Sequence, residues 1–212
     1  AALALIIAGV ELTLQLANLG VIGGPRGVGW RLAAVEQFGF SSGVLEHMIA
    51  RRDVAPSLVM RLLTYVFVNM NFTQAVFCAG LTLALGKYGG DFFGGVRVVV
   101  IYLISAVVGA LVFGLLAQGN AALIGGYAPV YGLIGAYTYA LWLRLGDAGE
   151  NQIKAFRLIG FLVGLQLVFG LLFGSTQMWI AEIGGFLCGG ELAFVMAPGG
   201  WSAFVARMRQ RG

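Results

Sequence analysis

The sequence predicts an all-α membrane protein, folded as a bundle of six transmembrane helices with one long connection after the first. Of the 212 residues, 59% are hydrophobic and 10% are charged, and the mean hydropathy is +0.91. A soluble domain has about half apolar and about a quarter charged residues. Six apolar stretches also have the length of a bilayer-spanning helix, about 17–25 residues each. We therefore expect residues 1–212 to form a single transmembrane domain.

The six expected helices follow one another with short connections, except after the first. They cover residues 3–19, 62–85, 96–117, 128–145, 155–173 and 179–196. The first contains Glu11 and Gln15, and no small-residue cleavage pattern follows it, so we expect a membrane span and not a signal peptide. Short connections make the later helices immediate neighbours in the bundle.

The long connection, residues 20–61, mixes large apolar side chains with arginines. The apolar residues are Trp30, Phe38, Phe40 and Met48, and the arginines are Arg26, Arg31, Arg51 and Arg52. Segments of this composition lie in the headgroup layer as short amphipathic pieces. We therefore expect this connection to be an interfacial loop.

Positive charge is spread over the helix ends, which argues against a nucleic-acid-binding surface. The formal net charge is +4, but a phosphate-binding face needs its Lys and Arg gathered together. Lipid headgroups are the expected counter-charge. One predicted membrane side carries Lys87, Arg97, Arg144, Lys154, Arg157, Arg207, Arg209 and Arg211, and the other carries Arg26, Arg31, Arg51, Arg52 and Arg61. The excess on the first side predicts both termini in the cytoplasm.

Small residues suggest close helix packing. Glycines recur four residues apart at Gly160 and Gly164, Gly170 and Gly174, and Gly185 and Gly189. This spacing lets helices approach closely where lipid gives no hydrophobic force between them. The two cysteines, Cys78 and Cys188, lie in apolar runs without metal-ligand spacing and are expected to be small buried hydrophobes. We expect neither a metal nor a cofactor.

Three carboxylates lie within the predicted spans, where ionisable groups are costly and usually functional. For Glu11 and Glu191 we expect an ordinary structural role, with the carboxyl protonated or hydrogen-bonded to its neighbours. Glu182 carries more weight, because the glycines after it would let another helix press against it. Glu182 and Glu191 are nine residues apart and so lie on different faces of the helix, and the spacing does not require one shared pocket.

Three stretches together resemble a known family. They are "MRLLTYVFVNMNFTQAVFCAGLTLALGKYGGDFFG" (60–94), "GGYAPVYGLIGAY" (125–137) and "AEIGGFLCGG" (181–190). They are similar to the second, fourth and sixth helices of the rhomboid family, which are intramembrane serine proteases with a six-helix core. In that family the fourth helix opens with a Gly-x-Ser-Gly turn carrying the nucleophile, and the sixth carries Ala-His-x-x-Gly, whose His is the base.

The resemblance implies that the catalytic positions are degenerate here. The nucleophile position is Tyr127 and the base position is Glu182. In the second helix, Gln74 stands for the oxyanion-stabilising His, Cys78 for the Asn and Asn69 for the first His, while Met60 and Arg61 replace Trp-Arg. We expect the ring of Tyr127 to lie near Glu182 and to close the former active-site pocket.

Residues that pack the scaffold are retained. The resemblance implies structural roles for Gly125, Tyr131, Gly135, Gly184 and Gly185. Tyr131 is the aromatic on which the catalytic His would stack, and Gly135 lets the fourth and sixth helices meet. The chain is thus expected to keep the rigid bundle without the chemistry.

The implied function is that of a catalytically inactive rhomboid-like protein, a pseudoprotease. Such a protein would bind other transmembrane proteins as a chaperone, an assembly factor or an accessory subunit of a membrane complex. The size of the core implies a bacterial plasma membrane. Clients would approach between the second and fifth helices, and lipid is a further expected partner. The candidate partner-facing residues are Trp30, Phe72, Phe77, Phe161, Phe169 and Phe173.

Two alternatives stay open. A transporter or proton-conducting protein could use Glu11, Glu182 and Glu191, although no inverted repeat and no pair of interrupted helices is visible. The second alternative is a residual intramembrane protease. It would need a nucleophile and a base, and the single histidine, His47, lies in the long loop.

Overall fold

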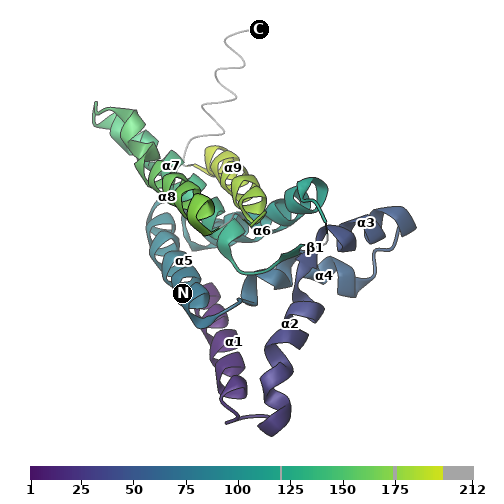
Figure 1. Cartoon of the computed structure of the whole chain (residues 1–212). Helices are drawn as coiled ribbons and strands as arrows, with labels where there is room; N and C mark the ends of the chain where they lie inside the picture. Colours follow the sequence, from purple (N-terminus) through teal and green to yellow (C-terminus); the bar gives the residue numbers. More distant parts are fainter. Residues whose placement is uncertain (120, 174–175, 198–212) are drawn as a thin grey trace.

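The structure is a computed structural model that describes residues 1–119, 121–173 and 176–197, and these residues are mostly helical (Figure 1). The α-helices are α1 (Ala2–Asn18), α2 (Trp30–Phe38), α3 (Ser42–Arg51), α4 (Pro56–Thr64), α5 (Phe72–Phe93), α6 (Gly95–Leu116), α7 (Tyr127–Asp147), α8 (Arg157–Phe173) and α9 (Trp179–Met196). The 3-10 turns are η1 (Gly24–Gly29), η2 (Tyr65–Phe67) and η3 (Gln152–Phe156), and the short strands are β1 (Phe40–Ser41) and β2 (Ala122–Leu123).

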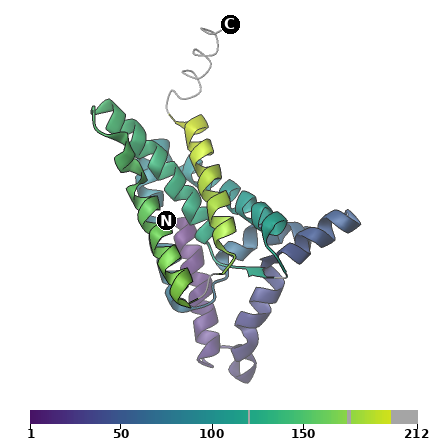
Figure 2. The same cartoon turned by 45° about the horizontal axis from the view of Figure 1, so that its top comes forward.

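The centre of the bundle is formed by α6, α7 and α9, which lie side by side in both views (Figures 1 and 2). Glycine makes this possible. A Cβ on Gly135 of α7 would overlap the Phe186 carbonyl oxygen of α9, and one on Gly189 of α9 would overlap the Gly132 carbonyl oxygen of α7. These are backbone contacts, so helices α7 and α9 meet with no side chain between them.

The glycine pattern of α8 has a different outcome from that of α9. A Cβ on Gly160 or Gly164 would meet nothing within 4 Å. The expectation of close packing at this pair was therefore wrong, because this face of α8 has no neighbour among the described residues. The second pair cannot be compared in this way, because Gly174 lies outside the described residues and the contacts of Gly170 are not described. The third pair, Gly185 and Gly189, does lie in the α7–α9 contact.

The second predicted helix, 62–85, was placed too early in the chain. The apolar run is divided instead into α4 with η2 and then α5, and the two parts are bent by 89°. Asn71 causes the new start: its side-chain oxygen accepts a hydrogen bond from the Gln74 backbone N–H at 2.9 Å, an N-cap that begins α5 at Phe72. The helix then continues to Phe93, beyond the expected end.

Residues 20–61 form several short pieces, namely η1, α2, β1, α3 and the first part of α4. Helices α1 and α2 form a V at one end of the molecule, and α3 and α4 extend to one side (Figure 1). Neither α2 nor α4 has a buried residue. Leu45 of α3 packs against α6, where a Cβ on Gly114 would lie 2.6 Å from the Leu45 Cδ2 atom.

Arg31 bonds to two other segments of the protein, α1 and the break before α5. Its guanidinium nitrogens lie 2.7 and 3.1 Å from the two carboxylate oxygens of Glu11, and Nη1 also donates to the Asn69 carbonyl at 2.6 Å. The Glu11 side chain is only 3% exposed. This ion pair joins α1 and α2 to the break before α5, so the Glu11 carboxyl has a cationic partner inside the protein.

Not every expected span reaches the length and hydropathy of a membrane-crossing helix. Among the described residues, α6 and α9 do, and the bent pair of α4–η2 with α5 would make a third. Helix α1 is apolar but has 17 residues. Helix α7 has 21 residues, yet its glycines, tyrosines and Thr138 lower its hydropathy. Several apolar helices thus remain, in keeping with a membrane protein.

Candidate functional site

The candidate site is the turn before α7, where residues 125–127 meet α5, α6 and α9. Gly125 has a φ of +89°, a left-handed conformation that favours glycine. Its N–H donates to the Tyr65 carbonyl at 2.9 Å. Just upstream, β2 pairs with β1 through Phe40 and Leu123. The turn is thus held from both sides, and Tyr127 follows as the first residue of α7.

Gln74 aims a hydrogen-bond donor at this turn. Its Oε1 accepts from the Met70 backbone N–H at 2.9 Å. This bond fixes the orientation of the side-chain amide, because only oxygen can accept. The Nε2 atom then faces Gly125, where a Cβ would lie 2.7 Å away. The position that resembles the oxyanion-stabilising His therefore still carries a donor beside the turn.

Buried polar atoms collect behind the turn. A Cβ on Gly126 would lie 2.6 Å from the Cys78 Sγ and 3.0 Å from the Tyr102 hydroxyl oxygen. The side-chain amide of Asn69, the Tyr102 hydroxyl and the Thr82 hydroxyl are buried and have no protein hydrogen-bond partner in the described part of the chain. Buried groups of this kind are usually bonded to ordered water. The surroundings of Cys78 therefore remain polar.

Glu182 faces the first turns of α7. It lies in the first turn of α9, where a carboxylate is favoured by the helix dipole, and is only 7% exposed. A Cβ on Gly185 would overlap the Ala128 carbonyl, so α9 crosses α7 at this level. Tyr127 and Tyr131 both lie close enough to Glu182 for its charge to affect them. Tyr127 is half-buried and Tyr131 buried, so two phenol rings and one carboxyl share this space.

A comparison with known families explains this arrangement. A family model described as the Rhomboid domain matches residues 56–199. The chain belongs to the rhomboid family. A search of curated proteins finds no match.

The rhomboid match covers every position that the three sequence motifs single out. It begins at α4 and ends after α9, and so includes the break before α5, the turn before α7 and Glu182. Helices α1, α2 and α3 precede the matched region. The Glu11–Arg31 pair therefore comes from outside the matched region but bonds directly to Asn69 within it.

The rhomboid bundle does not bring the other ionisable candidates to this turn. Glu11 is paired with Arg31. Glu191 is exposed on α9. His47 lies in α3, with its Nε2 3.5 Å from the Asp53 Oδ2. Among the described residues, no group of three or more His, Cys, Asp or Glu side chains is placed to hold a metal ion.

Sequence reasoning missed two contributors to the site. Tyr102 reaches the turn from α6, and a tyrosine in an apolar helix carries no signal of its own. Ser105 lies one turn further along α6 and is buried against Gly132 of α7. Their spacing of three residues places both on one helix face. Only the packing of that face against α7 distinguishes them from ordinary core residues.

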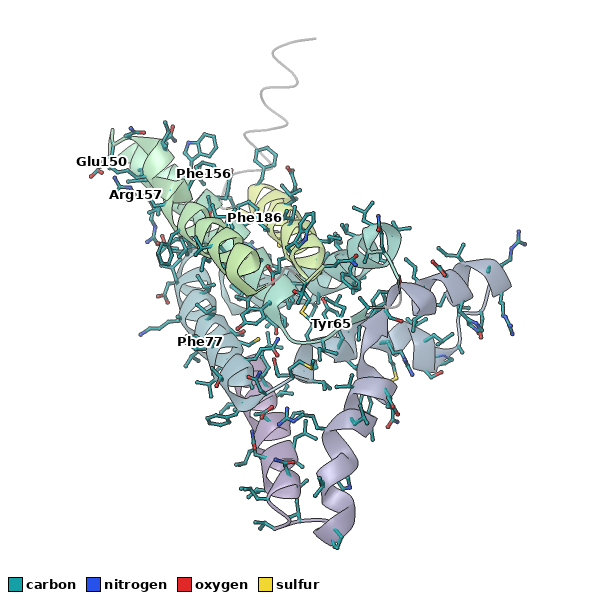
Figure 3. All side chains as sticks on the ribbon, in the orientation of Figure 1. Tyr65, Phe77, Glu150, Phe156, Arg157 and Phe186 are labelled. Atoms are coloured by element: carbon teal, nitrogen blue, oxygen red, sulfur yellow. The ribbon has the colours of Figure 1, made fainter. Side chains whose placement is uncertain are left out.

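The candidate partner-facing aromatics lie on the surface where they are described. Phe72 and Phe77 of α5 are 56% and 60% exposed, and Phe161 of α8 is 67% exposed. Phe77 is labelled on α5 in Figure 3. Trp30 at the start of α2 is 38% exposed. The side chains of Phe169 and Phe173 lie outside the described ones.

Proposed function

We propose that this rhomboid-family protein is a pseudoprotease, which binds transmembrane proteins without cutting them. The observation that carries the proposal is Tyr127 at the first position of α7, where the family resemblance places the serine nucleophile. Acyl transfer needs a nucleophile activated by a base. Opposite Tyr127 stands the carboxyl of Glu182, and the single histidine of the chain is in α3.

The remaining parts of the site support binding rather than catalysis. Gln74 directs a donor at the turn, but an oxyanion-stabilising donor accelerates only a reaction that a nucleophile has begun. Cys78 could serve as a thiol nucleophile only with a base, and its neighbours at Gly126 are the Tyr102 hydroxyl and a backbone carbonyl. We infer that the site is a packed part of the scaffold.

We further propose that α1, α5, α6, α7, α8 and α9 all cross a bacterial plasma membrane, with both chain termini in the cytoplasm. The partner would approach along α5 and α8, whose described aromatic side chains are largely exposed. Loose packing of α8 supports this choice, because its glycines Gly160 and Gly164 meet no neighbour. A role as chaperone, assembly factor or accessory subunit of a membrane complex follows.

The direct test is purification in a mild detergent, followed by mass spectrometry of the proteins that co-elute. We expect one or more intact transmembrane proteins in stoichiometric amounts. Recovery of cleaved fragments, with their formation dependent on Tyr127 or Cys78, would overturn the proposal in favour of a residual protease.

The transporter alternative is weakened by the placement of its carboxylates. Glu11 forms an ion pair with Arg31, Glu182 faces α7 and Glu191 lies on the surface of α9. A proton path through all three would have to displace the arginine. A liposome flux assay on wild type and Glu182→Gln decides the matter, since equal background flux removes the transporter.

A further inference from the structure

A groove lies between α7, α9 and η3, away from the turn at Tyr127. Its cavity has a volume of about 410 Å³. Its wall carries the aromatic side chains of Tyr139, Trp142, Phe156 and Phe194. The rings are arranged as two edge-to-face pairs, Tyr139 with Phe194 and Trp142 with Phe156, each with centroids 5.9 Å apart. Phe186, which also lines the groove, is labelled beside α8 and α9 in Figure 3.

One acid stands among these rings. Glu191 lines the groove from α9, and its side chain is exposed. Helix α9 is long and apolar enough to cross a membrane. At about 1.5 Å per residue, Glu191 lies roughly 7–8 Å inside the Met196 end of that helix. None of the ion pairs within the described residues involves Glu191.

A carboxylate on the surface of a membrane helix is costly without a counter-charge. The groove is built to attract one. Faces of Trp and Tyr draw a cation electrostatically, more strongly when water is excluded, and the adjacent carboxylate adds a direct ion pair. An anion would be repelled by the carboxylate, and a neutral donor would gain a hydrogen bond but neither the ion pair nor the cation–π attraction. The chemistry of the groove therefore selects a cation.

We propose that this groove receives a lysine or arginine side chain from the transmembrane helix of a partner protein. This inference rests on the proposed function, that the chain binds transmembrane proteins, and places a second contact on the α7–α9 face rather than on α5 and α8. The cavity lies at the small end of the range for ligand sites, about 300–1,000 Å³. It suits one long side chain inserted from a helix that runs along α9.

The test uses synthetic Leu/Ala transmembrane helices with one Lys about a turn and a half from the end, and matched helices with Gln or Glu at that place. Binding to the purified protein in liposomes is measured by fluorescence energy transfer. We expect wild type to bind the Lys helix at least tenfold more tightly than the Gln helix. Glu191→Gln should abolish this preference, and Glu191→Lys should transfer it to the Glu helix.

Asp91→Asn is the matched control. Asp91 is an exposed acid near the C-terminal end of α5, just as Glu191 is an exposed acid near the C-terminal end of α9. It should keep the full preference for Lys. Trp142→Leu should reduce the preference without reversing it. A preference that survives Glu191→Gln, or that Asp91→Asn removes equally, overturns the assignment. The probe helices are not the natural partner, so a failure of this test leaves the proposed function standing. The proposed function is tested separately by co-purification of the partner and by its loss when residues on α5 and α8 are changed.

Discussion

Gln74 directs its side-chain nitrogen at Gly125, so a Cβ on that glycine would lie 2.7 Å from Nε2. A donor stands at the turn, while Tyr127 and Glu182 occupy the positions that the resemblance assigns to the nucleophile and the base. The turn thus has the geometry that the rhomboid resemblance implies, but not the serine and histidine that its chemistry would need. It leads to a direct prediction about activity.

Wild-type protein should neither cleave a transmembrane reporter in liposomes nor react with a fluorophosphonate. The double change Tyr127→Ser with Glu182→His should restore little, because catalytic groups act as a unit and Gln74 and Cys78 also differ. The quadruple variant that also carries Gln74→His and Cys78→Asn should cleave the reporter faster than the double variant. An active rhomboid protease serves as the positive control for reporter and label. Wild-type cleavage that vanishes in Tyr127→Phe or Cys78→Ala would contradict the prediction.

The glycines of α7 and α9 give a prediction about stability. Gly135→Ala should destabilise the protein by about 1–3 kcal/mol, the usual cost of overpacking, because the atom it meets is the backbone carbonyl of Phe186 and cannot rotate away. Gly189→Ala should behave alike against Gly132. Thermal unfolding in detergent measures both.

Gly160→Ala on α8 is the control for these glycine variants. Its new Cβ meets nothing within 4 Å, and alanine is favoured over glycine inside a helix by about 0.5–1 kcal/mol. The unfolding midpoint should therefore stay or rise. Equal losses at Gly135 and Gly160 would show that the α7–α9 contact is not the source of the effect.

The helix positions were the most predictable part of the fold. Helix α9 begins at Trp179 and ends at Met196, the expected residues, because Pro198 follows closely and a proline does not continue a helix. The start of α5 was missed by ten residues. Hydropathy averages over a window, so it does not detect that Asn71 caps a new helix inside an apolar run.

The site was predictable in position but not in its surroundings. Motif spacing locates Tyr127 and Glu182, since each lies beside glycines that pack one helix against another. The contacts of Tyr102 and Arg31 depend on the three-dimensional packing of α6 and α2. A single arginine in an amphipathic segment looks the same in sequence whether it faces lipid headgroups or a buried glutamate. Glu191 is a further case, because its exposure depends on the rotation of α9, which the sequence alone does not give.

The Glu11–Arg31 pair should be essential for stability. Arg31→Leu leaves a carboxylate that is 3% exposed without its cation, and removing one partner of a buried pair costs about 3–5 kcal/mol. The double variant Glu11→Leu with Arg31→Leu should recover part of that loss, since no charge is then left buried. Thermal unfolding of the two single variants and the double variant measures the coupling.

The exposed pair Lys154–Glu150, 2.8 Å apart, is the control for this cycle. Lys154 lowers the pKa of Glu150 through its hydrogen bond and its charge. The contribution of the pair is therefore present at neutral pH and is lost as the pH falls through that lowered pKa. Because both side chains are solvated, Lys154→Ala should leave the unfolding midpoint unchanged at pH 7. A loss equal to that of Arg31→Leu would count against burial as the cause.

The docking surface on α5 and α8 gives the last prediction. Phe77→Ala and Phe161→Ala should weaken co-purification of the partner while expression and thermal stability stay intact, because both side chains are more than half exposed and neither belongs to the hydrophobic core. Aromatic truncation at an interface hot spot costs more than about 1 kcal/mol of binding free energy, which gives a measurable fall in recovery.

Leu12→Ala on α1, where Leu12 is 59% exposed, is the matched control for loss of exposed apolar area. Tyr127→Phe and Glu182→Gln should leave the partner bound, since Glu182 is buried and Tyr127 is half-buried near it. If these two changes abolish association and the helix-face changes do nothing, the altered catalytic site is itself the binding site.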